Sequence, residues 1–425
     1  MTLAAAPAGN VADALGIVVG VTLLMALSLT LPHLLSGKRA LPLWLGSALA
    51  GHTEFLFLGL LLGPHVLGLF DETLVEQMTP FLAVGLGWVG LFFGLQWDVR
   101  KMRRFKRSHF KIAGFQALVT CIIVTAAMAL ALWIDHRSGG HMVAGLSLRN
   151  RLILAATLGV VASVTAPIGI GWLIARHGAR GENTQLAQFL AATDGIVGIL
   201  LFGLVLSALQ PTAVIDVPGL RALSNFAVTI GIGIMLGVLA HHILHGRWSA
   251  PDYLLWLIGL VVLSSGAAHT IGQSPLVVNF VMGVIFVNLS HQSERVTKSL
   301  GGAEVPFYIV FLILGGATWS ISGGWAWILI LPYMLFRALG KVLGAALGPR
   351  IWRLHFHPLP QLGLAMLSQG GLALAMIISL GITLPQEPHV QALETIVIVS
   401  IVLNQMIAPT LAHRTLRRAG EIRLR

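Results

Sequence analysis

Charged residues are scarce in this chain. They make up 10% of its 425 residues, whereas ordinary globular domains carry about 25%. Apolar residues make up 56%, so a soluble protein of this composition would be unable to cover its surface with polar groups. The composition therefore excludes a soluble enzyme of two or three domains. At about 20 residues for each membrane crossing, the length accommodates roughly a dozen to fourteen membrane-spanning helices and no sizeable soluble domain.

Cysteine is almost absent too, and so are the groupings of side chains that enzymes use. The single cysteine, Cys121, excludes an intramolecular disulfide and says nothing about the compartment. The apolar runs contain neither a cluster of His, Asp or Cys at metal-ligand spacing nor a nucleophile beside a base. We therefore expect a protein that is not an enzyme and has no cofactor. No Lys or Arg precedes the first apolar run, and no small-residue cleavage site follows it, so we expect no cleaved signal peptide.

Thirteen apolar runs, bounded by charges, proline or glycine clusters, predict membrane-spanning helices. The fold class that they indicate is an all-α polytopic membrane protein. The predicted spans are residues 12–35, 41–70, 78–97, 110–134, 150–174, 184–209, 221–244, 252–270, 274–290, 303–319, 322–348, 359–384 and 389–412.

The basic residues predict the orientation of these spans. If the N-terminus lies outside, 21 of the 27 Lys and Arg residues fall in cytoplasmic segments, including residues 100–111 and a short basic tail at 413–425. Four fall in outer segments, namely Arg137, Arg149, Arg151 and Arg221. Cytoplasmic loops are enriched in Lys and Arg, so we expect the N-terminus outside, the C-terminus in the cytoplasm and a location in the cell (inner) membrane. The net charge of +11 then needs no nucleic-acid partner, and the lipid bilayer is the partner that we expect.

Two of the predicted spans are interrupted. Residues 162–171 (ASVTAPIGIG) contain one proline and two glycines, and residues 367–373 (LSQGGLA) contain two adjacent glycines beside Ser368 and Gln369. These spans are the fifth and the twelfth, so they cross the membrane in opposite directions. Interrupted helices at matching places in two halves are typical of inverted-repeat transporters, with residues 12–209 and 252–412 as the halves. The alternative is that glycine and proline are simply common in membrane helices.

Only a few charged side chains lie deep inside predicted spans, where charge is costly and usually functional. Asp194 is about ten residues from the cytoplasmic end of the sixth span, roughly 15 Å deep. Arg337 and Lys341 share one face of the eleventh span because they are four residues apart. Either of them is long enough to meet Asp194.

Asp194 has two interpretations. It is either half of an ion pair that locks two helices together, or a carrier site for a cation and a proton. Hydroxyls of Ser163, Thr165 and Thr193, with backbone carbonyls freed by the interrupted helices, would complete an oxygen site around the carboxylate. Such a site suits an alkali cation. Glu54, in the second span, faces either a helix interface or the ion path.

Motifs along nearly the whole chain resemble the monovalent cation/proton antiporter superfamily, in particular its Kef-like and bacterial Na⁺/H⁺ exchanger branch. The segment TDGIVGILLF (193–202) is similar to the helix with that family's Asn-Asp or Asp-Asp pair, and GKVLGAALG (340–348) to the helix with its membrane-embedded Lys. The other similar segments are GLLLGPHVLGLFDE (59–72), GLFFGLQWDVRKMRR (90–104), SPLVVNFVMGVIFVN (274–288) and VPFYIVFLILGG (305–316).

This resemblance implies a homodimeric antiporter that exchanges cytoplasmic Na⁺ or K⁺ for an external proton. It implies a six-helix core, spans four to six and eleven to thirteen, that moves against a dimer domain. Asp194 would bind cation and proton in alternation, and Lys341 would stabilise the helix crossing or compete for Asp194. The chain stops soon after its last span, so we expect no nucleotide-binding regulatory domain.

The chain departs from the family pattern at four places. Thr193 replaces Asn or Asp, Ala166 stands in the family's Thr-Asp-Pro, Leu372 replaces a frequent Glu, and Glu54 is offset by one position. These differences leave the choice among Na⁺, K⁺ and Li⁺ open. Two other functions also stay open, a sodium-coupled solute symporter of a related inverted-repeat fold and a transport-inactive relative that acts as a sensor.

Overall fold

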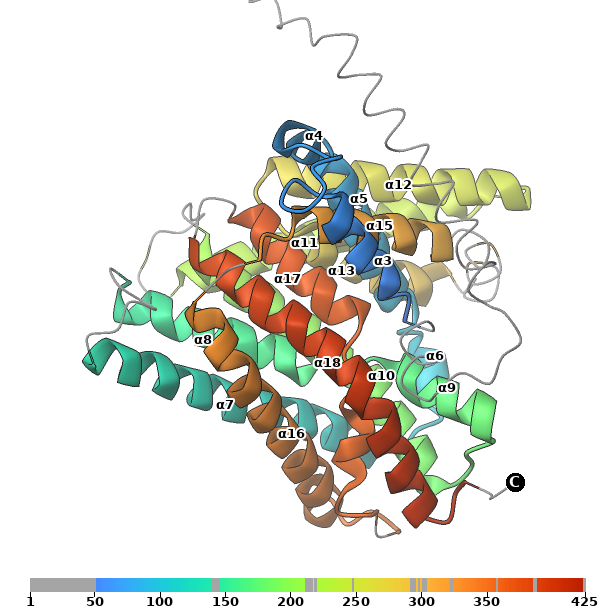
Figure 1. Cartoon of the computed structure of the whole chain (residues 1–425). Helices are drawn as coiled ribbons and strands as arrows, with labels where there is room; N and C mark the ends of the chain where they lie inside the picture. The colour runs from blue at the N-terminus through green and yellow to red at the C-terminus, as the bar shows by residue number, and fades with distance from the viewer. Residues whose placement is uncertain are drawn as a thin grey trace, which may run out of the picture.

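The computed structural model is helical throughout the part that it describes (Figure 1). It describes residues 51–422 except 139–145, 211–216, 218–219, 247, 291–295, 297–298, 300–303, 322–323, 357 and 385–387. The predicted span 12–35 lies outside the described residues. The helices are α3 (Glu54–Leu62), α4 (Glu72–Gln77), α5 (Thr79–Leu95), α6 (Val99–Met102), α7 (Arg107–Arg137), α8 (Leu148–Ser163), α9 (Pro167–His177), α10 (Glu182–Leu209), α11 (Arg221–Leu244), α12 (Ala250–Thr270), α13 (Pro275–Ser290), α15 (Glu304–Thr318), α16 (Trp325–Ile351), the 3₁₀ helix η1 (Leu362–Met366), α17 (Gly371–Thr383) and α18 (Pro388–Arg418).

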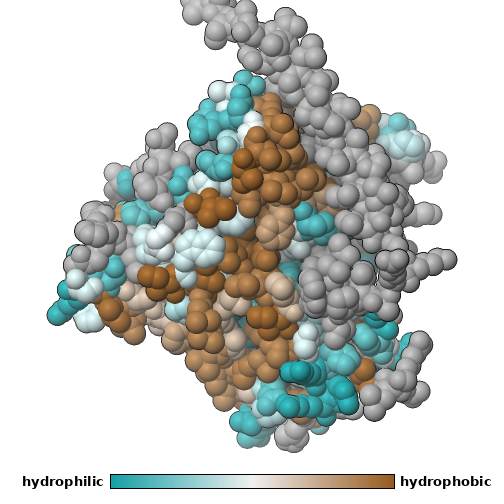
Figure 2. Space-filling model, viewed as in Figure 1, coloured by the Kyte–Doolittle hydropathy of each residue, from teal (hydrophilic) through white to brown (hydrophobic). Residues whose placement is uncertain are grey.

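By length and composition, seven helical segments among the described residues are able to cross a membrane, with α8 and α9 taken together. Four shorter apolar helices, α5, α13, α15 and α17, lie among them. Figure 2 shows apolar residues across the middle of the visible face and hydrophilic residues towards its edges. Exposed apolar side chains also lie along α7, α12 and α16, for example Ile122, Leu255 and Ile328. These faces are suited to lipid, and the total of thirteen spans stays a prediction.

The second predicted span, 41–70, differs from the structure because its helix ends early. Within this span the described helix is α3, which ends at Leu62, and Gly63 is extended with ψ at 171°. Pro64 disfavours the helical conformation at the residue before it, which explains the end of the helix. The chain then turns through Gly68, with φ at +62°, before Asp71 caps α4 by accepting from the Leu74 backbone N–H over 2.7 Å. That bond and one from Thr73 hold the pKa of Asp71 below its usual value.

The helices pack in two groups that are visible in Figure 1. In one group α3 packs on α15, and α13 packs on both α5 and α11. In the other group α7 packs on α8, α10 and α16, while α18 packs on α16, η1 and α17. The residues predicted around Asp194 lie in this second group, on α8, α10, α16 and the segments between α8 and α9 and between η1 and α17.

Candidate functional site

The interruption predicted at 162–171 is confirmed. Helix α8 ends at Ser163 and α9 begins at Pro167, with Val164 and Ala166 in extended conformations between them. Proline has no N–H to continue the helix and disfavours a helical residue before it. The last carbonyls of α8 consequently have no partner within their own helix.

The interruption predicted at 367–373 is also confirmed, and it lies against the first one. The 3₁₀ helix η1 ends at Met366, and α17 begins at Gly371 after an extended Gly370. The backbone N–H of Ala166 donates to the carbonyl of Ser368 over 2.9 Å. Two non-helical segments from distant parts of the chain therefore meet inside the helical bundle.

Asp194 lies at this meeting point with its side chain fully buried. The backbone N–H of Thr165 donates to Asp194 Oδ1 over 3.1 Å, and the Thr165 hydroxyl donates to Oδ2 over 2.7 Å. The same hydroxyl oxygen lies 3.2 Å from the carbonyl oxygen of Met366. The Thr165 hydroxyl thus lies between the Asp194 carboxylate and a carbonyl of the second interrupted helix.

Lys341 completes the group. Its ammonium lies 2.7 Å from Asp194 Oδ2 and 2.7 Å from the Thr165 hydroxyl oxygen, and it also donates to the carbonyl of Ser163. These three acceptors match the three donors of an ammonium group. Lys341 and Asp194 are both fully buried, so the ion pair is shielded from water.

Arg337 is equally buried but contacts carbonyls instead of Asp194. Its guanidinium donates to the carbonyls of Ala162, Val164 and Leu367 over 3.0, 3.0 and 2.7 Å. These are carbonyls freed where α8 and η1 end, and a cation is favoured at a helix C-terminus. Arg337 therefore joins the two interrupted helices.

The other predicted residues lie around this group in different ways. Ser163 contributes its carbonyl, while its hydroxyl donates to the carbonyl of Val160 over 2.7 Å. Thr193 is buried on the wall of a neighbouring cavity, and Ser368 is buried in the second interruption. The structure thus brings Asp194, Thr165 and Lys341 together.

Gln369 belongs to a polar network that the sequence analysis missed. Its side-chain nitrogen donates to Val161 O and the Tyr333 hydroxyl, and its side-chain oxygen accepts from Asn404 over 3.2 Å. The Gln405 side chain donates to the Gln369 carbonyl over 2.7 Å. Two adjacent amides, Asn404 and Gln405, inside an apolar run are the signal that would have revealed this network.

Two cavities lie beside residues that neighbour the ion pair. A cavity of about 330 Å³ has Thr165, Ala166 and Leu372 on its wall, together with aromatic residues such as Trp88 and Tyr308. A cavity of about 430 Å³ is lined by Thr193. Both are lined by Gln96, at the end of α5 that is predicted to be cytoplasmic. Glu54 lies near the first cavity, where one carboxylate oxygen is 3.9 Å from the ring of His52, a lining residue.

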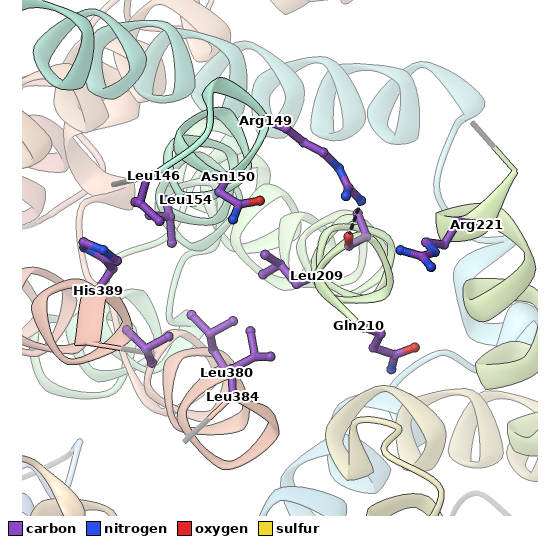
Figure 3. A pocket seen from close by; sticks show the side chains of 12 residues that line it. Leu146, Arg149, Asn150, Leu154, Leu209, Gln210, Arg221, Leu380, Leu384 and His389 are labelled. Carbon is purple, nitrogen blue, oxygen red and sulfur yellow. Dashed lines mark hydrogen bonds between the residues drawn. The ribbon is translucent and has the colours of Figure 1, made fainter. Parts of the chain in front are cut away.

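A third cavity, of about 150 Å³, lies at the ends of α8 and α10 that are farther from the ion pair (Figure 3). It is lined by the start of α8, the end of α10 and the start of α11, including Arg149, Gln210 and Arg221. Figure 3 shows the Arg149 side chain reaching the end of α10, where it donates to the carbonyl of Ala208 over 2.9 Å. Gln210 is sixteen residues from Asp194, or about 24 Å along a helix, so this cavity is remote from the ion pair.

Comparisons with known proteins identify the family. The chain matches the family described as "Sodium/hydrogen exchanger, transmembrane" over residues 40–413. No curated protein gives a significant match. A structure of the sodium proton antiporter MjNhaP1 from Methanocaldococcus jannaschii at pH 8 is similar with a TM-score of 0.65 and 16% identity, covering 95% of this chain and 99% of that chain. An EM map of the same antiporter gives a TM-score of 0.62 and 14% identity, covering 97% of this chain and 98% of that chain.

At these identities the two structures show a shared fold and nothing finer. The family match, in contrast, extends over most of the sequence and includes both the Asp194 and the Lys341 helices. This chain therefore belongs to the sodium/hydrogen exchanger transmembrane family, within the monovalent cation/proton antiporter superfamily.

Proposed function

We propose that this protein is an alkali cation/proton antiporter in which Asp194 binds the cation and the proton in alternation. The observation that carries the proposal is the buried Asp194–Lys341 pair at the crossing of two interrupted helices. A buried ion pair alone also fits a purely structural role. The oxygen atoms around this pair, and the cavities that reach its neighbours, favour a transport role.

The ligands that we propose for the cation are the Asp194 carboxylate, the Thr165 hydroxyl and the Met366 carbonyl. The Thr165 hydroxyl oxygen lies 2.7 Å from Asp194 Oδ2 and 3.2 Å from the Met366 carbonyl oxygen. Oxygen ligands suit an alkali cation. The Lys341 ammonium now lies where it neutralises the carboxylate. An arriving cation would displace it, and the carbonyl of Ser163 would still accept from the displaced ammonium.

Proton coupling follows from competition for one carboxylate. A protonated Asp194 has no negative charge to hold a cation, so binding of one ion excludes the other. Arg337 has its charge among backbone carbonyls and would remain there throughout the cycle. Thr193, on the wall of the second cavity, would lie along the route to the site.

The cavities suggest which side is open. Those beside Thr165 and Thr193 lie at the predicted cytoplasmic end, as expected for an inward-facing state of an alternating-access transporter. The cycle would export cytoplasmic Na⁺ or K⁺ and import a proton, and the family match makes Na⁺ the first ion to test.

We also propose a homodimer in the inner membrane. A reporter on the C-terminus tests the orientation, and the mass of the detergent-solubilised protein tests the dimer.

The decisive experiment compares Asp194→Asn with the wild type in proteoliposomes. Cation-induced pH changes are measured separately for Na⁺, K⁺ and Li⁺, with Glu76→Gln, at an exposed position of α4, as the control for loss of a carboxylate remote from the ion pair. We expect a folded but inactive Asp194→Asn, an active control, and a wild-type cation affinity that weakens as the pH falls. Normal exchange in Asp194→Asn, or an affinity that is indifferent to pH, would rule out this mechanism.

A further inference from the structure

The N-terminus of α10, the helix of Asp194, is capped by a residue from the far end of the chain. Its own N-cap residue, Gly181, makes no side-chain capping bond. Glu421, in the turn after α18, replaces that cap: Oε1 accepts from the backbone N–H of Asn183 over 2.8 Å, and Oε2 accepts from that of Thr184 over 2.7 Å. The side chains of Asn183 and Thr184 donate to the same two oxygens over 2.9 and 2.7 Å. These backbone N–H groups are among the four that a helix N-terminus leaves unpaired.

Glu421 also holds the other side of the α9–α10 turn. Its carbonyl accepts from the backbone N–H of Arg180 over 2.9 Å. A Cβ at Gly181 would lie 2.2 Å from the Glu421 carboxyl carbon, so the side chain fits against the turn only because residue 181 is glycine. One residue of the C-terminal segment therefore joins both ends of the turn.

The two helices that meet at this turn hold the two halves of the candidate site. Thr165 lies two residues before α9, and Asp194 lies on α10 about 18 Å from its start. The bonds of 3.1 and 2.7 Å between Thr165 and Asp194 depend on how α10 is placed along its axis relative to α9. A movement at the turn is transmitted along α10 because a helix is rigid over this length.

We propose that Glu421 is a positioning residue for the cation site, which it maintains by clamping the α9–α10 turn so that Asp194 stays in register with Thr165. This inference rests on the proposed function, because it takes Asp194 and Thr165 to be the cation ligands. A carboxylate is the group of choice here, since the N-terminus of a helix favours negative charge.

The hydrogen bonds that join Glu421 to Arg180, Asn183 and Thr184, here called the clamp, persist through the neutral pH range. Burial raises the pKa of Glu421, but the bonds from Thr184 and Asn183 outweigh this effect, so the pKa lies below its usual value. A carboxylate whose pKa is lowered on folding stabilises the structure above its ordinary pKa, and this stabilisation is lost as the pH falls through the lowered value. Changes in affinity near neutral pH therefore do not report on loss of the clamp.

Two variants break the clamp in different ways. Glu421→Gln removes the negative charge, and Gly181→Ala keeps the charge but displaces the carboxylate. The matched control is Glu182→Gln, because the Glu182 carboxylate lies at the same helix end and makes an exposed contact with His355 at 3.2 Å. We expect both clamp variants to raise the KM for Na⁺ about fivefold, the factor that corresponds to a typical lost N-cap. We expect kcat to change less than about twofold, the pH of half-maximal activity to stay unchanged, and the control to behave as the wild type.

Anion rescue separates the capping role from a general loss of structure. In Glu421→Ala the exposed helix N-terminus is able to bind a small anion, so choline sulfate should restore the KM where choline chloride of equal ionic strength does not. If Glu421→Ala folds poorly, Thr184→Val, which removes one of the four bonds, should show a smaller shift of the same kind. A wild-type KM in both clamp variants, or an equal shift in Glu182→Gln, would overturn the proposal. Failure of the proposed function would instead appear as absent cation–proton competition in the wild type.

Discussion

At the scale of residues, the two buried cations on α16 have different partners although they lie one helical turn apart. Lys341 contacts the carboxylate of Asp194, whereas Arg337 donates to carbonyls of the interrupted helices. The partner sets indicate separate roles. In the proposed cycle Lys341 would be released when Asp194 binds its cation, whereas Arg337 donates to carbonyls at the interruptions of the helices.

This difference predicts unequal costs of removal. Arg337→Met would leave the carbonyls of Ala162, Val164 and Leu367 buried without a donor, at about 1–3 kcal/mol for each unsatisfied group. Lys341→Met would leave a carboxylate that still accepts two bonds from Thr165 and is able to bind a proton. We therefore expect Arg337→Met to lower the unfolding temperature in detergent well below that of Lys341→Met. Arg350→Met, at an exposed position of the same helix, serves as the control. Equal losses in the two buried variants would refute the separation of roles.

The sequence was sufficient to predict which charged side chains are buried, but not which of them form an ion pair. Asp194, Arg337 and Lys341 stand out because charge is rare in apolar runs. Arg337 and Lys341 share a helix face, so their spacing is compatible with either as the partner of Asp194. Which of the two cations pairs with Asp194 depends on where the freed carbonyls lie, and that is a property of the tertiary structure. The direction of the Ser163 hydroxyl, towards Val160 O, is likewise set by local backbone geometry.

At the scale of elements, close packing of α16 on α7 positions Lys341. A Cβ at Gly344 would lie 2.8 Å from the Cα of Gln116, and one at Gly340 would lie 2.7 Å from the Cα of Thr120. These contacts involve backbone atoms that cannot move away cheaply. Small residues at such spacing let membrane helices approach closely, so the glycines on both sides of Lys341 fix its depth and direction.

We predict different effects on stability for two glycine-to-alanine substitutions in this helix pair. Gly344→Ala should lower the stability by about 1–3 kcal/mol, the usual cost of overpacking, and should reduce transport by moving Lys341. Gly114→Ala, on α7, meets nothing within 4 Å. It should be neutral or raise the stability by up to about 1 kcal/mol, because alanine is the better helix former. Thermal unfolding of the purified variants measures both effects, and a stabilised Gly344→Ala would contradict the packing argument.

Element boundaries were predictable where one residue dictates the backbone. Pro167 and the pair Gly370 and Gly371 mark the two interruptions, and the structure has its breaks there. Long-range contacts were not predictable in the same way. The predicted tail begins at residue 413, yet α18 continues to Arg418 and the following turn brings Glu421 to α10. That contact joins residues 237 positions apart, and no local pattern indicates it.

At the scale of the whole molecule, the number of ionisable groups at the site determines the charge moved in each cycle. The family often has two adjacent acidic or amide residues on this helix, whereas here Thr193 precedes Asp194. The displaced Lys341 keeps a carbonyl acceptor at Ser163, so it is able to retain its proton while the cation is bound. In the proposed mechanism one carboxylate would exchange one cation for one proton, and no net charge would cross the membrane.

We therefore predict electroneutral exchange. Moving one elementary charge through 100 mV is worth about 2.3 kcal/mol, so an electrogenic cycle would respond strongly to an imposed potential. Valinomycin and a potassium gradient set that potential in proteoliposomes while Na⁺ uptake is followed, and we expect the initial rate to change by less than about twofold. If the wild-type rate does respond to the potential, Lys341→Gln tests whether Lys341 is the second group that titrates. Should the response disappear in this variant, Lys341 must release its proton when the cation binds, and the assignment of Asp194 as the only titrating group would be wrong.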